Sequence, residues 1–245
     1  MYKAAYVRIV PELLLSEPRN LNCGTRLKKG ATVLLAIVNY PAGNQTSVDR
    51  AFKRLGIEAV VSSEPQALAA AHGLIFPGVG AAGSAMNHLR STGLADLLAK
   101  LVRAGKPLLG ICLGCQIILD FSQENGAVCL GLLSGQCRRF VSGGLERDGT
   151  PLRIPHMGWN SIRMLRPCRL LNNIPQGAEF YFVHSYYPDP AQEYVLAMTE
   201  YGREFCSVLG RDGLWAVQFH PEKSGEPGLK ILANFYEYCQ ETAHA

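Results

Sequence analysis

The sequence predicts an α/β fold with a doubly wound, mainly parallel sheet and added antiparallel strands. In the first half, short apolar runs rich in branched residues alternate with amphipathic segments. This alternation is typical of a parallel sheet covered on both faces. In the second half, strand-like segments are separated by turn pairs such as Gly143-Gly144 and Asp212-Gly213. Such pairs are typical of hairpins, so antiparallel strands should extend the sheet or lie beside it.

The first half of the chain should supply the parallel strands. Its expected elements are a strand at 31–38, a turn at 39–44, a helix at 47–55, a strand at 57–63, a helix at 66–71, a strand at 73–76 and a helix at 84–98. A further strand ends at Leu108 and Leu109 and leads into a helix at 113–121. Functional groups of such sheets gather at the carboxyl ends of the strands.

The second half should supply the antiparallel strands. They are expected at 130–140, 152–165, 180–188, 194–202, 205–210 and 214–220, and an amphipathic helix at 227–238 closes the chain. No internal repeat and no low-complexity segment interrupts this order.

Residues 1–30 are expected to form a poorly ordered N-terminal extension, and 31–245 a single domain. Pro11, Pro18 and Gly24 interrupt the weak periodicity of this leader. The formal charge of the chain is +4, and the leader carries six Lys and Arg residues against two Glu residues. The predicted domain is therefore formally neutral, so a basic face for nucleic acid is not expected.

Cytoplasmic localisation is expected. No apolar run has the length of a membrane span, and no signal peptide is recognisable at the start. Eight cysteines in a chain of this kind are expected to be reduced thiols and not a disulfide framework.

Cys112 is the candidate nucleophile. It is the centre of Gly110-Ile111-Cys112-Leu113-Gly114, which has the spacing of a tight strand-to-helix elbow. Glycines are needed on both sides because the turn is strained and brings strand and helix close together. The thiol should lie at the N-terminal end of a helix, which favours the thiolate. Gln116, one helical turn further on, should lie beside the sulfur.

Two further segments complete the candidate site. The glycine-rich loop 77–83 follows an expected strand, and beside the elbow it could donate backbone N–H groups to an oxyanion. His220 ends the last expected strand, and Glu222 stands two residues later, on the same side of an extended segment. A carboxylate beside an imidazole fixes its tautomer, as a thiol nucleophile requires.

These motifs resemble those of class I glutamine amidotransferases and, within them, the HisH family of glutaminase subunits of imidazole glycerol phosphate synthase. The matching segments are PAGN (41–44), PGVGAAGSAM (77–86), GICLGCQ (110–116), LGLLSGQCRRF (130–140), PHMGWN (155–160), FYFVHSYY (180–187) and QFHPEKSG (218–225). Cys115 stands where this family usually has Met.

The resemblance implies hydrolysis of glutamine to glutamate and ammonia, with no cofactor and no metal. It implies a catalytic triad of Cys112, His220 and Glu222. The implied oxyanion donors are the backbone N–H groups of Val79, Gly80 and Leu113, and the implied substrate-binding residues are Gln116, Ser185 and Tyr186. His184 is expected to be structural and not a second base.

The resemblance also implies a partner, because free ammonia would be lost to water. That partner is a HisF-type cyclase, a (β/α)₈ barrel that receives the ammonia in a heterodimer. The implied interface residues are Asn44, His156, Met157, Trp159 and Lys223. Trp159 also has the residue type enriched at interface hot spots, although a buried core position is the alternative for a tryptophan.

Other functions explain less of the sequence. Cys112 and Cys115 form a C-x-x-C at a helix start, as in redox proteins, but this leaves Gln116, His220 and Glu222 unexplained. A zinc site lacks a second pair of ligands at suitable spacing. A non-catalytic interaction subunit would not need the triad. A HisH-like subunit that supplies a different acceptor, such as a sugar-modifying enzyme, has the same motifs.

Overall fold

A computed structural model describes residues 33–141, 143–144 and 149–243. The predicted extension at 1–30 lies outside the described residues. Among the described helices, none combines the length and apolarity needed to cross a bilayer.

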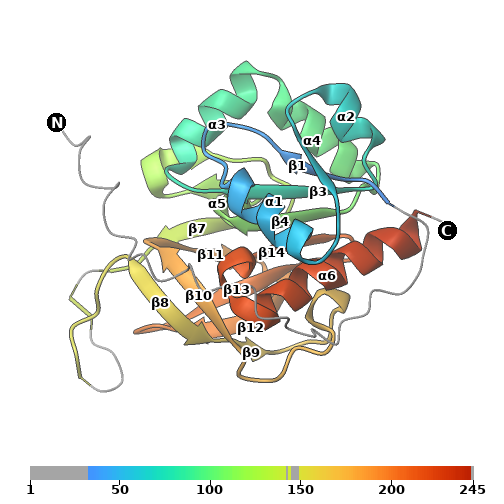
Figure 1. The fold of residues 1–245 in the computed structure, drawn as a ribbon. Coiled ribbons are helices and arrows are strands. Elements are labelled where there is room, and N and C mark those ends of the chain that lie inside the picture. Colours follow the sequence, from blue (N-terminus) through green and yellow to red (C-terminus); the bar gives the residue numbers. More distant parts are fainter. Residues whose placement is uncertain (1–32, 142, 145–148, 244–245) are drawn as a thin grey trace.

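The central sheet has eight strands in the order β2-β1-β3-β4-β14-β13-β12-β9 (Figure 1). Its parallel strands are β1 (Leu35–Val38), β2 (Ala59–Ser62), β3 (Gly73–Gly78), β4 (Leu108–Cys112) and β14 (Leu214–Val217). The antiparallel strands added beyond β14 are β13 (Glu204–Arg211), β12 (Val195–Glu200) and β9 (Arg163–Met164). The predicted fold class is therefore confirmed.

Helices cover both faces of the parallel part of the sheet (Figure 1). They are α1 (Gln45–Arg54), α2 (Pro65–Ala70), α3 (Ala82–Ser91), α4 (Leu94–Arg103), α5 (Leu113–Ile117) and α6 (Gly225–Thr242). Leu35 and Ile37 of β1 belong to one buried cluster, together with side chains of α1 and α6. Ala36 and Val38 belong to a second cluster with α2, α3 and α4. Alternate residues of the strand thus face opposite cores, which is why the predicted run is apolar throughout.

Two smaller sheets complete the second half. One pairs β8 (His156–Ser161) with β10 (Glu179–His184), and the other has the order β11-β7-β5-β6. The strands of the latter are β5 (Phe121–Ser122), β6 (Ala127–Val128), β7 (Gly135–Arg139) and β11 (Tyr186–Pro190). Single-turn 3₁₀ helices lie at η1 (Glu124–Gly126), η2 (Arg169–Leu171), η3 (Gln192–Tyr194) and η4 (Pro221–Lys223).

Several of the predicted elements were wrong in their extent. The expected strand at 152–165 is divided at Ile162 into β8 and β9, which belong to different sheets. The expected helix at 84–98 is two helices, because Gly93 adopts a left-handed conformation (φ 74°) and starts α4 in a new direction. The helix after Cys112 ends at Ile117 and not at Phe121, which instead starts β5. The expected strand at 180–188 is divided at Ser185 into β10 and β11, which belong to different sheets.

Candidate active site

The elbow has the predicted strained geometry. Cys112 is the last residue of β4 and directly precedes α5. Its backbone has φ 55° and ψ −109°, a positive-φ conformation that non-glycine residues rarely adopt. A Cβ on Gly114 would lie 1.9 Å from the carbonyl oxygen of Phe76, and one on Gly110 would lie 3.0 Å from the carbonyl oxygen of Gly114. Both glycines are therefore required for the close approach of α5 to the sheet. The Cys112 side chain is buried at this bend, with 6% of the residue exposed.

His220 and Glu222 form a buried pair next to this thiol. His220 follows β14, which is hydrogen-bonded to β4. Its Nδ1 lies 2.7 Å from Oε1 of Glu222, and both side chains are shielded from solvent. Burial lowers the pKa of His220, but the charge of Cys112 and the hydrogen bond and charge of Glu222 outweigh it and raise that pKa to about 10. The arrangement therefore favours the imidazolium form of His220.

The second ring nitrogen of His220 is free to exchange a proton. Nε2 is buried and has no hydrogen-bond partner among the described residues. Since Nδ1 is held by the carboxylate, Nε2 is the atom that can accept or deliver a proton at the active site. The sequence-predicted triad residues are thus brought together in the fold.

Asn44, which is partly exposed, contacts the candidate acid. Its Nδ2 donates a hydrogen bond of 2.9 Å to Oε1 of Glu222, the same oxygen that contacts His220. Asn44 therefore helps to orient the Glu222 carboxylate, a contact that the sequence did not predict, and the interface position implied by the resemblance stays a prediction.

The Gln116 side chain is connected to the nucleophile through the side chain of Gln218. Its Nε2 donates to the carbonyl oxygen of Tyr186 and to Oε1 of Gln218, both at 2.9 Å. Nε2 of Gln218 in turn lies 3.8 Å from Sγ of Cys112. Ser185 is partly buried between β10 and β11, and its carbonyl oxygen accepts from the N–H of Phe140.

Sequence reasoning missed Gln218 as a site residue. It stands two residues before His220, and its side chain is fully buried. The alternation that put His220 and Glu222 on one side of the chain, extended two residues backward, would have found it.

The predicted oxyanion donors differ in their availability. Leu113 is the first residue of α5, where backbone N–H groups have no partner within the helix. Gly80 follows β3 in a left-handed conformation (φ 91°). The N–H of Val79, however, donates to the carbonyl oxygen of Ala42 at 2.5 Å. In this conformation the Val79 donor is therefore occupied by the turn after β1 and is not directed at the nucleophile.

The predicted interface residues also separate into two groups. Met157 and Trp159 alternate on the outer side of β8 and are 59% and 55% exposed. Lys223 is exposed, with Nζ 6.0 Å from the centre of the Tyr181 ring. His156 is only 3% exposed, because its side chain points to the opposite side of β8. Its side chain is therefore largely enclosed, although His156 also lines the surface cavity beside Met157 and Trp159.

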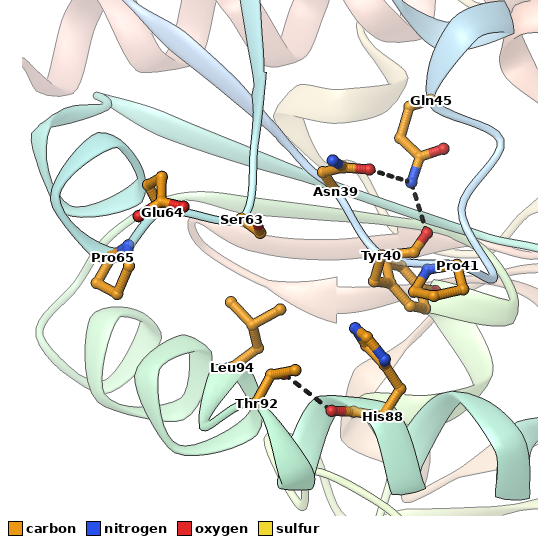
Figure 2. A pocket seen from close by; sticks show the side chains of 10 residues that line it. All are labelled: Asn39, Tyr40, Pro41, Gln45, Ser63, Glu64, Pro65, His88, Thr92 and Leu94. Carbon is orange, nitrogen blue, oxygen red and sulfur yellow. Dashed lines mark hydrogen bonds between the residues drawn. The ribbon is translucent and has the colours of Figure 1, made fainter.

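A separate hollow lies at the carboxyl ends of β1 and β2 (Figure 2). It has a volume of about 690 Å³, and Asn39, Gln45, Glu64 and His88 are among its polar lining residues. The Gln45 amide donates to Oδ1 of Asn39 at 3.2 Å and to the Tyr40 carbonyl oxygen at 2.7 Å (Figure 2). No residue of the triad lines this hollow, so it is not the site formed by the elbow.

The cysteine geometry gives no support to the redox alternative. The cysteines of the described segments are all free thiols. Cys115 is fully buried on α5, and burial, followed by the neighbouring Cys206, raises the pKa of its thiol well above the usual value. An inert second thiol cannot act as a resolving cysteine. Among the described residues, no group of three or more His, Cys, Asp and Glu side chains could hold a metal ion.

A comparison with known protein families identifies the family of this chain. The family described as glutamine amidotransferase class-I matches residues 36–239 of this chain. The chain belongs to the class I glutamine amidotransferases. It is therefore an enzyme of that family, and the elbow, the imidazole and the carboxylate lie within the matched segment of the amidotransferase.

Individual relatives narrow the family to HisH. The amidotransferase is 61% identical over 212 residues to imidazole glycerol phosphate synthase subunit HisH of Nitratidesulfovibrio vulgaris (strain Miyazaki F), covering 86% of this chain and 100% of the relative. HisH of Maridesulfovibrio salexigens is 57% identical with the same coverage. HisH of Geobacillus thermodenitrificans is 47% identical, covering 82% and 94%. The resemblance of the sequence motifs to the HisH family is confirmed.

Solved structures agree on the fold. A structure described as glutamine amidotransferase has a TM-score of 0.63 and 22% identity, covering 83% of this chain and 98% of that chain. PurLQS from Thermotoga maritima has a TM-score of 0.63 and 19% identity, covering 84% and 99%. At these identities the likeness concerns the α/β architecture of the amidotransferase alone.

Proposed function

We propose that this amidotransferase is the glutaminase subunit of imidazole glycerol phosphate synthase. It hydrolyses glutamine to glutamate and ammonia and passes the ammonia to a cyclase subunit in histidine biosynthesis. The observation that carries the proposal is 61% identity over the whole length of a HisH protein. The buried contact of 2.7 Å between His220 and Glu222, next to the strained Cys112, supports a working nucleophile and base.

The first half of the proposed reaction forms a thioester. The Cys112 thiolate attacks the side-chain carboxamide carbon of glutamine, and the carbonyl electrons move to the oxygen. His220 then donates the proton on Nε2 to the nitrogen, the carbon–nitrogen bond breaks, and ammonia leaves. The absence of another partner for Nε2 within the described chain supports this role. Glu222 stabilises the imidazolium without becoming protonated.

The second half releases glutamate. His220, now neutral, takes a proton from water, and the resulting hydroxide attacks the thioester carbon. The carbon–sulfur bond breaks, and Cys112 returns to the thiolate. Both tetrahedral intermediates carry an oxyanion, for which we assign the N–H groups of Leu113 and of the loop at Val79 and Gly80. Since Val79 donates to Ala42 here, its peptide must turn before it can take part.

Gln116, Ser185 and Tyr186 are the proposed substrate-binding residues. Both amide protons of Gln116 are used within the protein, one for Tyr186 and one for Gln218. Its remaining polar atom, Oε1, is an acceptor and suits the ammonium group of glutamine. The substrate would thus be bound at its amino-acid end, with its carboxamide toward Cys112.

The proposed partner is a HisF-type (β/α)₈ cyclase in a heterodimer. Met157 and Trp159 lie on an exposed part of β8, beside a surface cavity of about 810 Å³. Exposed Met and Trp side chains are typical of interface centres. Lys223 is exposed and directly follows Glu222 of the triad, which supports its place at the same interface. We propose the cytoplasm as the compartment, consistent with seven described cysteines that are all free.

The test is glutamate release from glutamine by the isolated chain and by the chain mixed with the cyclase and its ribonucleotide substrate. We expect turnover to rise on mixing and to vanish in Cys112→Ser. Glutaminase activity that is indifferent to the cyclase would instead favour a different acceptor, such as a sugar-modifying enzyme.

The proposed interface needs a separate test. Trp159→Ala should weaken binding of the cyclase by about ten-fold or more, as expected for an interface anchor. Val61→Ala is a matched control, because Val61 is 41% exposed on β2 at the far end of the central sheet. Equal affinities for the two variants would reject the surface around Trp159.

A further inference from the structure

A buried pair of histidines lies between β8 and β10, outside the triad. His156 and His184 are cross-strand partners in the antiparallel register, and both side chains are buried. Nδ1 of His156 lies 3.0 Å from Nε2 of His184. The His156 ring is stacked between Tyr201, at 3.9 Å between ring centres, and Phe182, at 4.9 Å. The reaction proposed above uses neither ring.

The inner end of this pair fixes the tautomer of His184. Its Nδ1 lies 2.7 Å from the carbonyl oxygen of Tyr186, which can only accept a hydrogen bond. Nδ1 of His184 therefore carries the proton. In a neutral ring Nε2 must then be the acceptor, so Nδ1 of His156 donates to it.

The outer end of the pair leads to the same assignment. Oδ1 of Asn160 accepts from the N–H of Ser161 at 2.8 Å, and its Nδ2 donates to the Glu200 carbonyl oxygen at 2.8 Å. The orientation of the Asn160 amide is therefore fixed. Its Nδ2 also lies 3.3 Å from Nε2 of His156, which must be the acceptor. Both ends thus require protonated Nδ1 in both rings.

An additional proton has no place in this chain of donors and acceptors. Protonation of His184 at Nε2 would set an N–H against the N–H of His156 at 3.0 Å. Burial lowers the pKa of His156 to about 4. Burial, followed by the neighbouring His156, lowers the pKa of His184 to about 3. Both rings are therefore neutral at physiological pH, and each hydrogen bond in the series keeps its donor and its acceptor.

This series of hydrogen bonds ends at the groups that surround the nucleophile. The Tyr186 carbonyl oxygen accepts from His184 at 2.7 Å and from the Gln116 amide at 2.9 Å. The same Gln116 nitrogen donates to Oε1 of Gln218. If the Gln116 amide were turned over, its oxygen would face two other oxygens. A fixed Tyr186 carbonyl therefore holds the Gln116 amide in one orientation.

We propose that His184, with its tautomer set by His156 and Asn160, is a positioning residue for glutamine binding. It holds the Tyr186 carbonyl, which orients Gln116 beside Cys112. The inference rests on the proposed glutaminase function, and it adds two residues that act on the substrate through others. It also explains why a polar pair occupies an otherwise aromatic core, where each ring would be costly without its partner.

A matched pair of variants tests this role in the full chain mixed with the cyclase. Asn and Leu have similar shape and volume, but only Asn can place an amide N–H near the position of Nδ1. His184→Leu should raise the KM for glutamine about five-fold, the effect of one lost hydrogen bond, with a smaller change in kcat. His184→Asn should stay within about two-fold of the original chain. Equal KM values in the two variants would overturn the proposal, because a role in packing alone depends on volume.

A spectroscopic test reads the tautomers directly in the unmodified chain and needs no enzymatic activity. Long-range ¹H–¹⁵N correlation of the full chain with labelled histidine should show protonated Nδ1 and unprotonated Nε2 in both rings at neutral pH. The signals are assigned by their loss in His156→Asn and His184→Asn. A protonated Nε2 in either ring would overturn the inference. Absence of glutaminase activity in the unmodified chain would reject the proposed function, but the NMR spectrum would still determine the tautomers of the two histidines.

Discussion

Replacing Glu222 by Gln should separate the charge of the triad acid from its geometry. Both hydrogen bonds of the carboxylate, from His220 at 2.7 Å and from Asn44 at 2.9 Å, are made to Oε1. Oε2 is buried and without a partner among the described residues. In Glu222→Gln the amide oxygen can keep both contacts, with its NH₂ group at the place of Oε2. The shape of the triad is then retained, and the negative charge is lost.

The expected loss follows from the spacing of the charges. An imidazolium and a carboxylate whose charge centres are about 4 Å apart attract each other by about 4 kcal/mol at an effective dielectric constant of about 20. Loss of that attraction in the transition state corresponds to a decrease of about 10³-fold in kcat. Burial lowers the pKa of His220, and Cys112 and Glu222 together raise it to about 10. Without the carboxylate, the pKa should fall.

The assay is glutamate release in the presence of the cyclase, together with an NMR titration of the His220 ring. Asn44→Ala is the control, because it removes one hydrogen bond and leaves the charge. We expect it to cost about ten-fold in kcat, the effect of one hydrogen bond to a charged group. If Glu222→Gln retained kcat within ten-fold of the original chain, the electrostatic reasoning would be refuted.

Three further predictions concern the elbow and its surroundings. Gly114→Ala should destabilise the fold by more than about 2 kcal/mol and abolish turnover, because the new methyl group would lie 1.9 Å from the Phe76 carbonyl oxygen; urea unfolding and the glutaminase assay measure the two effects. Cys115→Ser should keep turnover within about two-fold, since this buried thiol takes no part in the chemistry, and loss of turnover with Cys112 intact would instead favour the redox alternative. The pKa of His220 is raised on folding from 6.5 to about 10, so its protonation stabilises the fold fully below about pH 6.5, and this stabilisation is lost as the pH rises through about 10. The difference in unfolding free energy between the original chain and His220→Gln should shrink over that range, and a constant difference in urea titrations would contradict the assignment.

The elements of the site that are local in sequence could be predicted from it. The glycine spacing around Cys112 indicated the elbow, because only glycine allows α5 to approach Phe76 so closely. The two-residue spacing of His220 and Glu222 indicated their contact. The long apolar run of β1 indicated a strand that is buried on both faces. In each case the decisive interaction lies within a few residues along the chain or follows from a simple period.

The features that were missed depend on contacts between distant segments. The bond from Asn44 to Glu222 joins residues 178 positions apart. The capture of the Val79 N–H by Ala42 depends on how the turn after β1 meets β3. The pairing of His156 with His184 requires the register of β8 and β10. No propensity or motif contains this information, so residue types indicated chemistry at these positions but not the partner of each group.

The position of β4 between two parallel neighbours has a consequence for how activity can be switched. On one side β14 leads to His220, and on the other β3 leads to Val79. The proposed acid–base group and the proposed oxyanion donor thus follow strands on opposite sides of the strand that carries Cys112. Rotation of a single peptide after β3 alters the second without disturbing the first. In the proposed mechanism, the assembled enzyme would stay inactive until that peptide turns, and activation would need no movement of Cys112.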